Sequence, residues 1–179
     1  GRLPKTLTLR LMTETGSVKL GTLTADRGFL HPDSRLAAVA LELGRQGGSL
    51  VYATGPKDAE SVAQLLYSGC PDKTEAPLEA LSKFIIKHIH PEYGLATLVR
   101  RGVAFHYGKM PTLLREAIEG AFKSGDLRFL ACTTTLFQGV NLPARNVFIH
   151  TSTRGRGTEL NPAELWNFAG RAGRMNSDV

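Results

Sequence analysis

Short apolar segments alternate with longer amphipathic segments along most of this chain, and this alternation limits the fold more than any other feature. Short runs typical of buried strands lie at residues 49–52, 103–106, 128–131 and 147–150. Apolar residues at helical spacing follow or precede them at residues 34–43, 57–67, 78–89, 92–101, 112–122 and 162–172. Strands separated by helices with short connections predict an α/β fold, with a mostly parallel sheet covered by helices on both faces.

The first thirty residues have a different pattern. Residues 7–11 and 18–23 are typical of extended chain, and the sequence ETGS at residues 14–17 favours a turn between them. A β-hairpin is therefore expected here. We interpret residues 1–30 as an arm or linker and residues 31–179 as one domain, because the sequence HPDS at residues 31–34 indicates the start of the first helix.

Composition agrees with one domain and leaves several functions open. The chain has 179 residues, 42% of them hydrophobic, which is enough for one core. A net charge of +6 favours polyanionic partners, although charge alone discriminates poorly. No stretch is long and apolar enough to span a bilayer, and no signal-peptide pattern is present. Cys70 and Cys132 lie in unrelated contexts, so we expect free thiols and a cytoplasmic or nucleoid-associated protein without a membrane partner.

Two arginines close to the C-terminus form the most informative local pattern. Arg171 and Arg174 lie in the run NFAGRAGR at residues 167–174. On a helix they would be one turn apart and point the same way, and their glycine and alanine neighbours would leave room for a bulky anion. Arginine offers paired donors that match phosphate oxygens. The alternative is a solvated basic helix end that suits the helix dipole.

A second pattern, CTTTLFQGVNLPA, lies at residues 132–144 between two of the expected strands. Threonines at the end of a strand offer hydroxyl and backbone N–H groups to a phosphate. Gly139 lets the backbone approach a ligand closely. Asn141 either contacts that ligand or only orders the turn before Leu142 and Pro143.

The combination of these patterns resembles the second RecA-like domain of superfamily 2 helicases, closest to the superkiller-like DExH-box branch. Residues 133–144 resemble motif V of that family, and residues 167–174 resemble motif VI. Residues 103–125 are similar to the segment between motifs IV and V, and residues 50–60 are placed like motif IV. The resemblance implies a three-layer RecA-like domain and an ATP-dependent nucleic-acid helicase or translocase.

The ATP-binding motifs of such a helicase are missing from this sequence. It contains no Gly-x-x-x-x-Gly-Lys-Ser/Thr loop for a triphosphate and no strand ending in an Asp-Glu pair. The resemblance places both in a first RecA-like domain, which would hold ATP with Mg²⁺. We therefore expect this chain alone to be inactive in hydrolysis and unwinding, and that first domain to be one of its partners.

The resemblance also implies roles for residues at the ATP. Arg174 would be the arginine finger that stabilises charge on the transferring phosphoryl group, with Arg171 contacting phosphate beside it. Further nucleotide contacts would come from motifs V and VI, namely Gly139, Asn141, Asn167 and Gly170. Asn167 stands where related branches usually have Gln or His.

The nucleic-acid track is expected across the strand ends. The resemblance places Thr133, Thr54, Gly55 and His106 there, against the sugar–phosphate backbone of DNA or RNA, single-stranded during translocation. A packed, hydrogen-bonded histidine is the alternative for His106. Gly55 and the proline after it replace a Ser–Arg pair that is common in the family, so backbone groups would make that contact.

Two alternatives complete the sequence-based prediction. His88 and His90 suggest a metal site, but no Cys or carboxylate stands at ligand spacing, so we predict none. A non-catalytic RecA-fold module that binds nucleic acid or protein is the competing function. The presence of both Arg171 and Arg174 argues against it, because a binding module has no use for an arginine finger.

Overall fold

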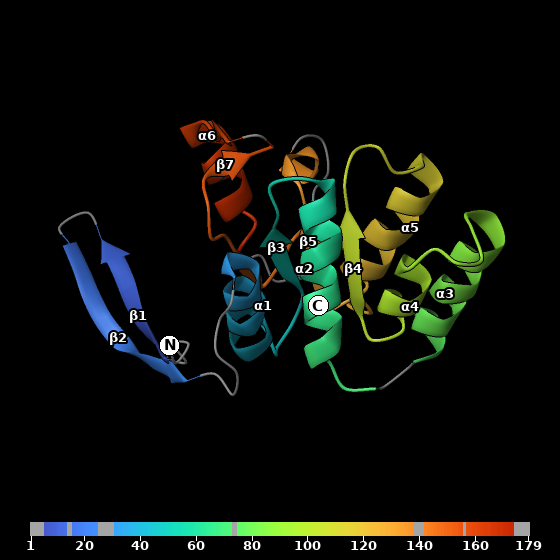
Figure 1. Ribbon diagram of the computed structural model, residues 1–179, viewed down its shortest axis with the longest axis horizontal. Helices are drawn as coiled ribbons and strands as arrows, with labels where there is room; N and C mark the ends of the chain where they lie inside the picture. The colour runs from blue at the N-terminus through green and yellow to red at the C-terminus, as the bar shows by residue number, and fades with distance from the viewer. Residues whose placement is uncertain are drawn as a thin grey trace, which may run out of the picture.

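The computed structural model describes residues 6–13, 16–24, 31–72, 75–137, 142–155 and 157–173. Within these ranges the chain forms an N-terminal hairpin and an α/β body, which Figure 1 shows side by side. No helix among the described residues is both long enough and apolar enough to cross a bilayer.

The hairpin agrees with the sequence-based expectation. It consists of β1 (Thr6–Thr13) and β2 (Gly16–Thr24), which pair antiparallel along their whole length. The register shifts between Leu9 and Arg10, so one extra residue is accommodated in the ladder.

The central sheet of the body is parallel, as the alternation predicted. Its strands are β3 (Ser49–Tyr52), β4 (Val103–His106), β5 (Phe129–Cys132) and β6 (Asn146–Phe148), in the order β4-β5-β3-β6. The expected bounds of β3 and β4 are confirmed, whereas β5 and β6 each begin one residue away from the expected position. Every residue of β3, β4 and β5 is buried, which explains why these strands are continuous apolar runs.

Helices cover the sheet and begin mostly where proline favours the first turn. They are α1 (Pro32–Leu43), α2 (Pro56–Gly69), α3 (Ala76–His88), α4 (Leu95–Val99), α5 (Thr112–Lys123) and α6 (Pro162–Ala169). Proline stands in the first turn of α1, α2, α3 and α6, where its missing N–H costs nothing. In α6 the side chains of Asn161 and Glu164 also form a reciprocal capping box.

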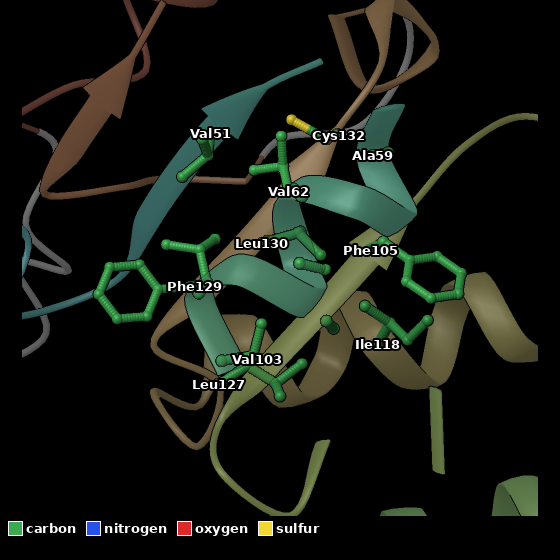
Figure 2. Packing of buried hydrophobic residues seen from close by; sticks show 14 of the residues in the cluster. Val51, Ala59, Val62, Val103, Phe105, Ile118, Leu127, Phe129, Leu130 and Cys132 are labelled. Carbon is green, nitrogen blue, oxygen red and sulfur yellow. The ribbon is translucent and has the colours of Figure 1, made fainter. Parts of the chain in front are cut away.

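The core lies between the sheet and these helices. Figure 2 shows α2, with Ala59 and Val62, crossing in front of β4 and β5, while α5, with Ile118, lies behind β4. The expected cover on both faces is therefore confirmed. The last apolar residue of the expected first helix, Leu43, is exposed at the end of α1, whereas Leu36, Ala37 and Ala40 are buried.

Two predicted helices are shorter than the sequence pattern indicated. Residues 92–101 were expected to be helical, but α4 covers only Leu95–Val99, between a turn at Gly94 and a left-handed Gly102 with φ +71°. Helix α6 ends at Ala169 rather than at residue 172, because Gly170 caps it and Gly173 is left-handed with φ +72°.

Two further elements had no counterpart in the prediction. The short 3-10 helix η1 (Thr134–Phe137) begins just after β5, where a Thr-rich loop was expected. A small antiparallel ribbon of β7 (Thr153–Arg154) and β8 (Thr158–Glu159) follows β6 and leads into α6.

Candidate nucleic-acid interface

The parallel strands all end at one edge of the sheet, where the candidate residues gather. A groove of about 360 Å³ lies at this edge. The segments that follow β3, β4 and β5 line it, together with part of the β7–β8 ribbon: residues 54–56, 107–109 and 133–135 with Arg154, Gly155 and Thr158. In parallel α/β sheets this edge is where ligands bind. The prediction placed Thr54, Gly55 and Thr133 on one track, and the structure brings all three to this groove.

The lining of the groove suits a polyanion. Lys109 and Arg154 supply positive charge, five threonines supply hydroxyl groups, and the described part of the lining contains no Asp or Glu. Gly55 is also the N-cap of α2, so the positive pole of a 14-residue helix adds to the positive potential in the groove. Backbone phosphates are the anions that such a combination of hydroxyls, cations and backbone N–H groups commonly binds.

Two of the five threonine hydroxyls donate to partners within the protein. The Thr54 hydroxyl donates to the Asp58 carboxylate, so it has no proton left for a phosphate. The Thr133 hydroxyl donates to that of Thr135 at 3.4 Å, and little of Thr133 is exposed. These contacts leave Thr134 and Thr135, both half-buried, as the more accessible hydroxyls of this segment.

Gly108 is needed for the shape of the groove. A Cβ atom at this position would lie 2.9 Å from both Cγ2 and Oγ1 of Thr135, closer than real Cβ contacts allow. The loop after β4 can therefore lie against η1 only because residue 108 has no side chain.

The structure contradicts one predicted nucleic-acid contact. His106 has no exposed surface, and its Nε2 lies 2.9 Å from Oε1 of Glu119 on α5. Burial lowers the pKa of His106 below its ordinary value, and the hydrogen bond to Glu119 opposes this effect. The ring is thus a packed core group, the alternative left open above, because β4 is covered on both faces up to its last residue.

The neighbouring Tyr107 is the residue after β4 that does reach the groove. Its hydroxyl donates to Oε1 of Glu60 at 2.8 Å, and its ring stacks on Phe105 with centroids 5.7 Å apart. Burial, together with the hydrogen bonds to Tyr93 and Glu60, raises the pKa of Tyr107 far above its usual value. Sequence reasoning missed this residue, although its position directly after a strand was a usable signal.

The motif VI residues are arranged differently from the prediction. Arg171 lies in the turn that follows α6, outside the helix on which the sequence pattern placed it. Only 6% of Arg171 is exposed. Burial of Cys132 raises the pKa of its thiol, and the positive charge of Arg171 partly offsets this increase. Asn167 and Gly170 are exposed. Arg174, the predicted arginine finger, lies outside the described residues.

Motifs V and VI lie next to each other in space. Ala144 forms a parallel bridge with Ala172, and the Ala144 N–H donates to the Arg171 carbonyl at 3.1 Å. Gly139 and Asn141, the predicted nucleotide contacts of motif V, are outside the described residues. The two segments that the sequence assigned to the nucleotide are therefore joined by backbone hydrogen bonds at their flanks.

A second, larger hollow of about 660 Å³ lies beside the groove and shares Thr54 with it. Its other lining residues come from the first turns of α1 and from the segment after β6: Pro32, Arg35, His150, Thr151 and Thr153. His150 Nε2 lies 3.6 Å from Oδ1 of Asp33. The prediction contained neither Arg35 nor His150, because only the fold brings α1 next to the end of β6.

The parallel sheet and its ligand-binding edge define a RecA-like α/β domain, and comparison with known proteins places it in a family. Residues 83–176 match the helicase conserved C-terminal domain, so the chain belongs to that family and is the C-terminal RecA-like domain of a superfamily 2 helicase.

Known helicases are among its relatives. The chain is 36% identical over 157 residues to the ATP-dependent DNA helicase Hel308 of Methanocella arvoryzae, a match that covers 82% of this chain and 21% of that protein. It is 31% identical over 128 residues to Anti-bacteriophage protein B of Escherichia coli, covering 71% and 17%. It is 45% identical over 85 residues to mouse DNA polymerase theta, covering 48% and 3%. The chain thus spans about a fifth or less of the length of these relatives.

Proposed function

We propose that this chain serves an ATP-dependent DNA helicase or translocase of the superkiller-like branch, in which its groove holds the sugar–phosphate backbone of single-stranded DNA. The observation that carries this proposal is the groove itself, whose lining includes two cations, five threonines and, among the described residues, no carboxylate. Contacts of this kind hold the backbone without reading bases, which suits a motor that moves on any sequence. DNA is the proposed track because the related proteins from Methanocella arvoryzae and Pyrobaculum calidifontis are named DNA helicases.

ATP with Mg²⁺ is proposed to bind between this domain and a first RecA-like domain of the same polypeptide. Among the described residues no three His, Cys, Asp or Glu side chains gather in a way that could hold a metal ion. This chain would therefore contribute only part of the nucleotide site. Asn167 and Gly170 are exposed and accessible to a nucleotide, whereas Arg171 is buried and suited to ordering the turn before Arg174.

The bound nucleotide would supply a phosphoryl group that carries developing negative charge during hydrolysis. Arg174 is proposed to stabilise that charge, with Gly139 and Asn141 as further contacts from motif V. On this proposal the isolated chain neither hydrolyses ATP nor unwinds a duplex. Residues 1–30 are proposed to connect it to the first domain, and the protein to act in the cytoplasm or at the nucleoid.

Phosphate release by the full-length protein, with and without single-stranded DNA, tests this proposal. We expect hydrolysis that single-stranded DNA stimulates. Arg174→Ala should lower the stimulated rate by about 10³-fold or more and leave DNA affinity almost unchanged. Arg100→Ala is a matched control, because this exposed arginine stands just before β4, at the opposite edge of the sheet.

The competing function is a non-catalytic module that binds nucleic acid or protein, and the burial of Arg171 is the observation that favours it. A module of this kind would show no hydrolysis under any condition, and Arg174→Ala would change nothing. If hydrolysis is stimulated, a strand-displacement assay then separates a helicase from a translocase that moves on duplex DNA.

A further inference from the structure

Arg154 stands at the groove although no motif of the sequence pointed to it. It is the last residue of β7, its side chain is 42% exposed, and it lines the groove together with Lys109 and the threonines after β5. A partly exposed guanidinium among hydroxyl groups offers several donors to an anion.

The backbone on both sides of Arg154 is tied to β3 and the loop that follows it. The Tyr52 hydroxyl donates to the Thr153 carbonyl at 2.8 Å, and the Gly155 N–H donates to the Thr54 carbonyl at 2.8 Å. These two bonds bracket Arg154 and place its Cα at the edge of the groove. The backbone around this arginine is therefore already ordered before any ligand binds, which lowers the cost of binding.

The Arg154 side chain is also oriented by a carboxylate on the side away from the groove. Nη1 of Arg154 donates to Oε1 of Glu164, a carboxylate of α6 whose side chain is only 13% exposed and which does not line the groove. The other carboxylate oxygen, Oε2, accepts the Asn161 N–H at 3.0 Å in the capping box of α6. Glu164 thus occupies one donor of the guanidinium, whose planar fork has five.

We propose that Arg154 binds a backbone phosphate of single-stranded nucleic acid in this groove, and that Glu164 is the positioning residue that holds its guanidinium there. This inference rests on the proposed function and adds a phosphate-binding residue to it. The contact also connects the track with α6, the helix that leads into the motif VI turn.

The test is the salt dependence of binding by the full-length protein to a labelled oligothymidylate, measured by fluorescence anisotropy over a series of sodium chloride concentrations. Each phosphate neutralised on a single strand contributes about 0.7 to the slope of log K against log salt concentration. Arg154→Ala should reduce that slope by about 0.7 and weaken binding about tenfold at moderate salt. Arg154→Lys should keep the slope, because the charge remains, and lose affinity because the planar fork is gone.

The Arg154→Ala substitution made in a Glu164→Gln protein excludes the main competing explanation, which is repulsion of DNA by an unpaired Glu164 carboxylate. Arg154→Ala leaves the Glu164 carboxylate without its partner, and that charge alone could repel DNA. Glu164→Gln removes the charge while its amide oxygen can still accept the Asn161 N–H, since Gln also serves in capping boxes. In the Glu164→Gln protein, Arg154→Ala should again reduce the slope by about 0.7. A reduction seen only when Glu164 is present would overturn the proposed contact.

The remaining outcomes separate this inference from the function on which it rests. Arg100→Ala removes an exposed arginine that is likewise paired, with Glu79 at 3.3 Å, and should leave the slope unchanged. An unchanged slope in Arg154→Ala, with normal binding by the unmodified protein, refutes the phosphate contact but not the helicase function. No binding of the oligothymidylate by the unmodified protein refutes both.

Discussion

Removing the hydroxyl group of Tyr52 tests how the β7–β8 ribbon is held at the groove. Tyr52 is the last residue of β3 and is fully buried. Its hydroxyl donates to the Thr153 carbonyl, and its ring makes an edge contact with Phe168 of α6, with centroids 5.9 Å apart. Tyr52→Phe keeps the ring and its contacts but removes the hydrogen bond across 101 positions of sequence.

The expected cost is the net value of one neutral hydrogen bond. Burial raises the pKa of Tyr52 to about 12, so the hydroxyl is protonated and can donate throughout the neutral range. Such a bond contributes about 0.5–1.5 kcal/mol. Thr153 is half-buried and lines the larger hollow, so its surroundings are partly open to solvent. We therefore expect a loss of about 1 kcal/mol, or a factor of about five in the folding equilibrium. Tyr52→Ala, which also removes the ring, should cost about 3–5 kcal/mol.

Urea unfolding of this chain, followed by circular dichroism, measures both values, provided that the slope of free energy against urea concentration stays constant. Tyr67→Phe serves as the matched control, because the described residues show no hydrogen bond to its hydroxyl and its ring stays under Arg101. A Tyr52→Phe protein as stable as the unmodified chain would refute the anchoring role of the hydroxyl. A large loss in Tyr67→Phe would show that the comparison reports general disturbance instead.

Three further predictions concern His106, Gly108 and the two cysteines. Burial lowers the pKa of His106 below 6.5, so between the lowered value and 6.5 the unfolded chain binds more protons than the folded chain. The free energy of unfolding should therefore fall as pH decreases through that window. His106→Gln should make the free energy of unfolding, measured in urea, less dependent on pH in the same window. Gly108→Ala should cost about 1–3 kcal/mol through its clash with Thr135, and adding Thr135→Ala should recover most of it in the same assay. Cys70 and Cys132 are buried with raised pKa values, so neither should react with a thiol reagent until denaturant is added; rapid reaction of the native chain would contradict their placement.

The strands of the central sheet could be predicted to within one or two residues, whereas helix ends and the β7–β8 ribbon could not. Continuous apolar runs such as residues 49–52 and 103–106 have only one stable location, the middle of a covered parallel sheet. The ends of α4 and α6 depend on whether a glycine turns left-handed, as Gly102 and Gly173 do. That choice is made by the contacts of the following segment, which periodicity does not contain.

The candidate site shows the same division. Thr54, Gly55 and Thr133 were placed correctly at one edge because the carboxyl ends of parallel strands must meet there. Arg154 was missed because β7 is too short to produce a periodic signal. His106 was misplaced because the position of a residue at a strand end does not reveal whether a helix covers it, and here Glu119 of α5 does.

The sequence by itself determined that this chain forms a parallel α/β domain and that its motif V and motif VI segments belong to a helicase C-terminal domain, because local apolar patterns and contiguous motifs encode both. Only the tertiary structure decided which side chains reach the groove. Three contacts between different segments of the chain decide this: the burial of Arg171, the ion pair of Arg154 with Glu164, and the close approach of Gly108 to Thr135. Local sequence patterns do not encode these contacts, because each of them forms only when the folded chain packs its segments together.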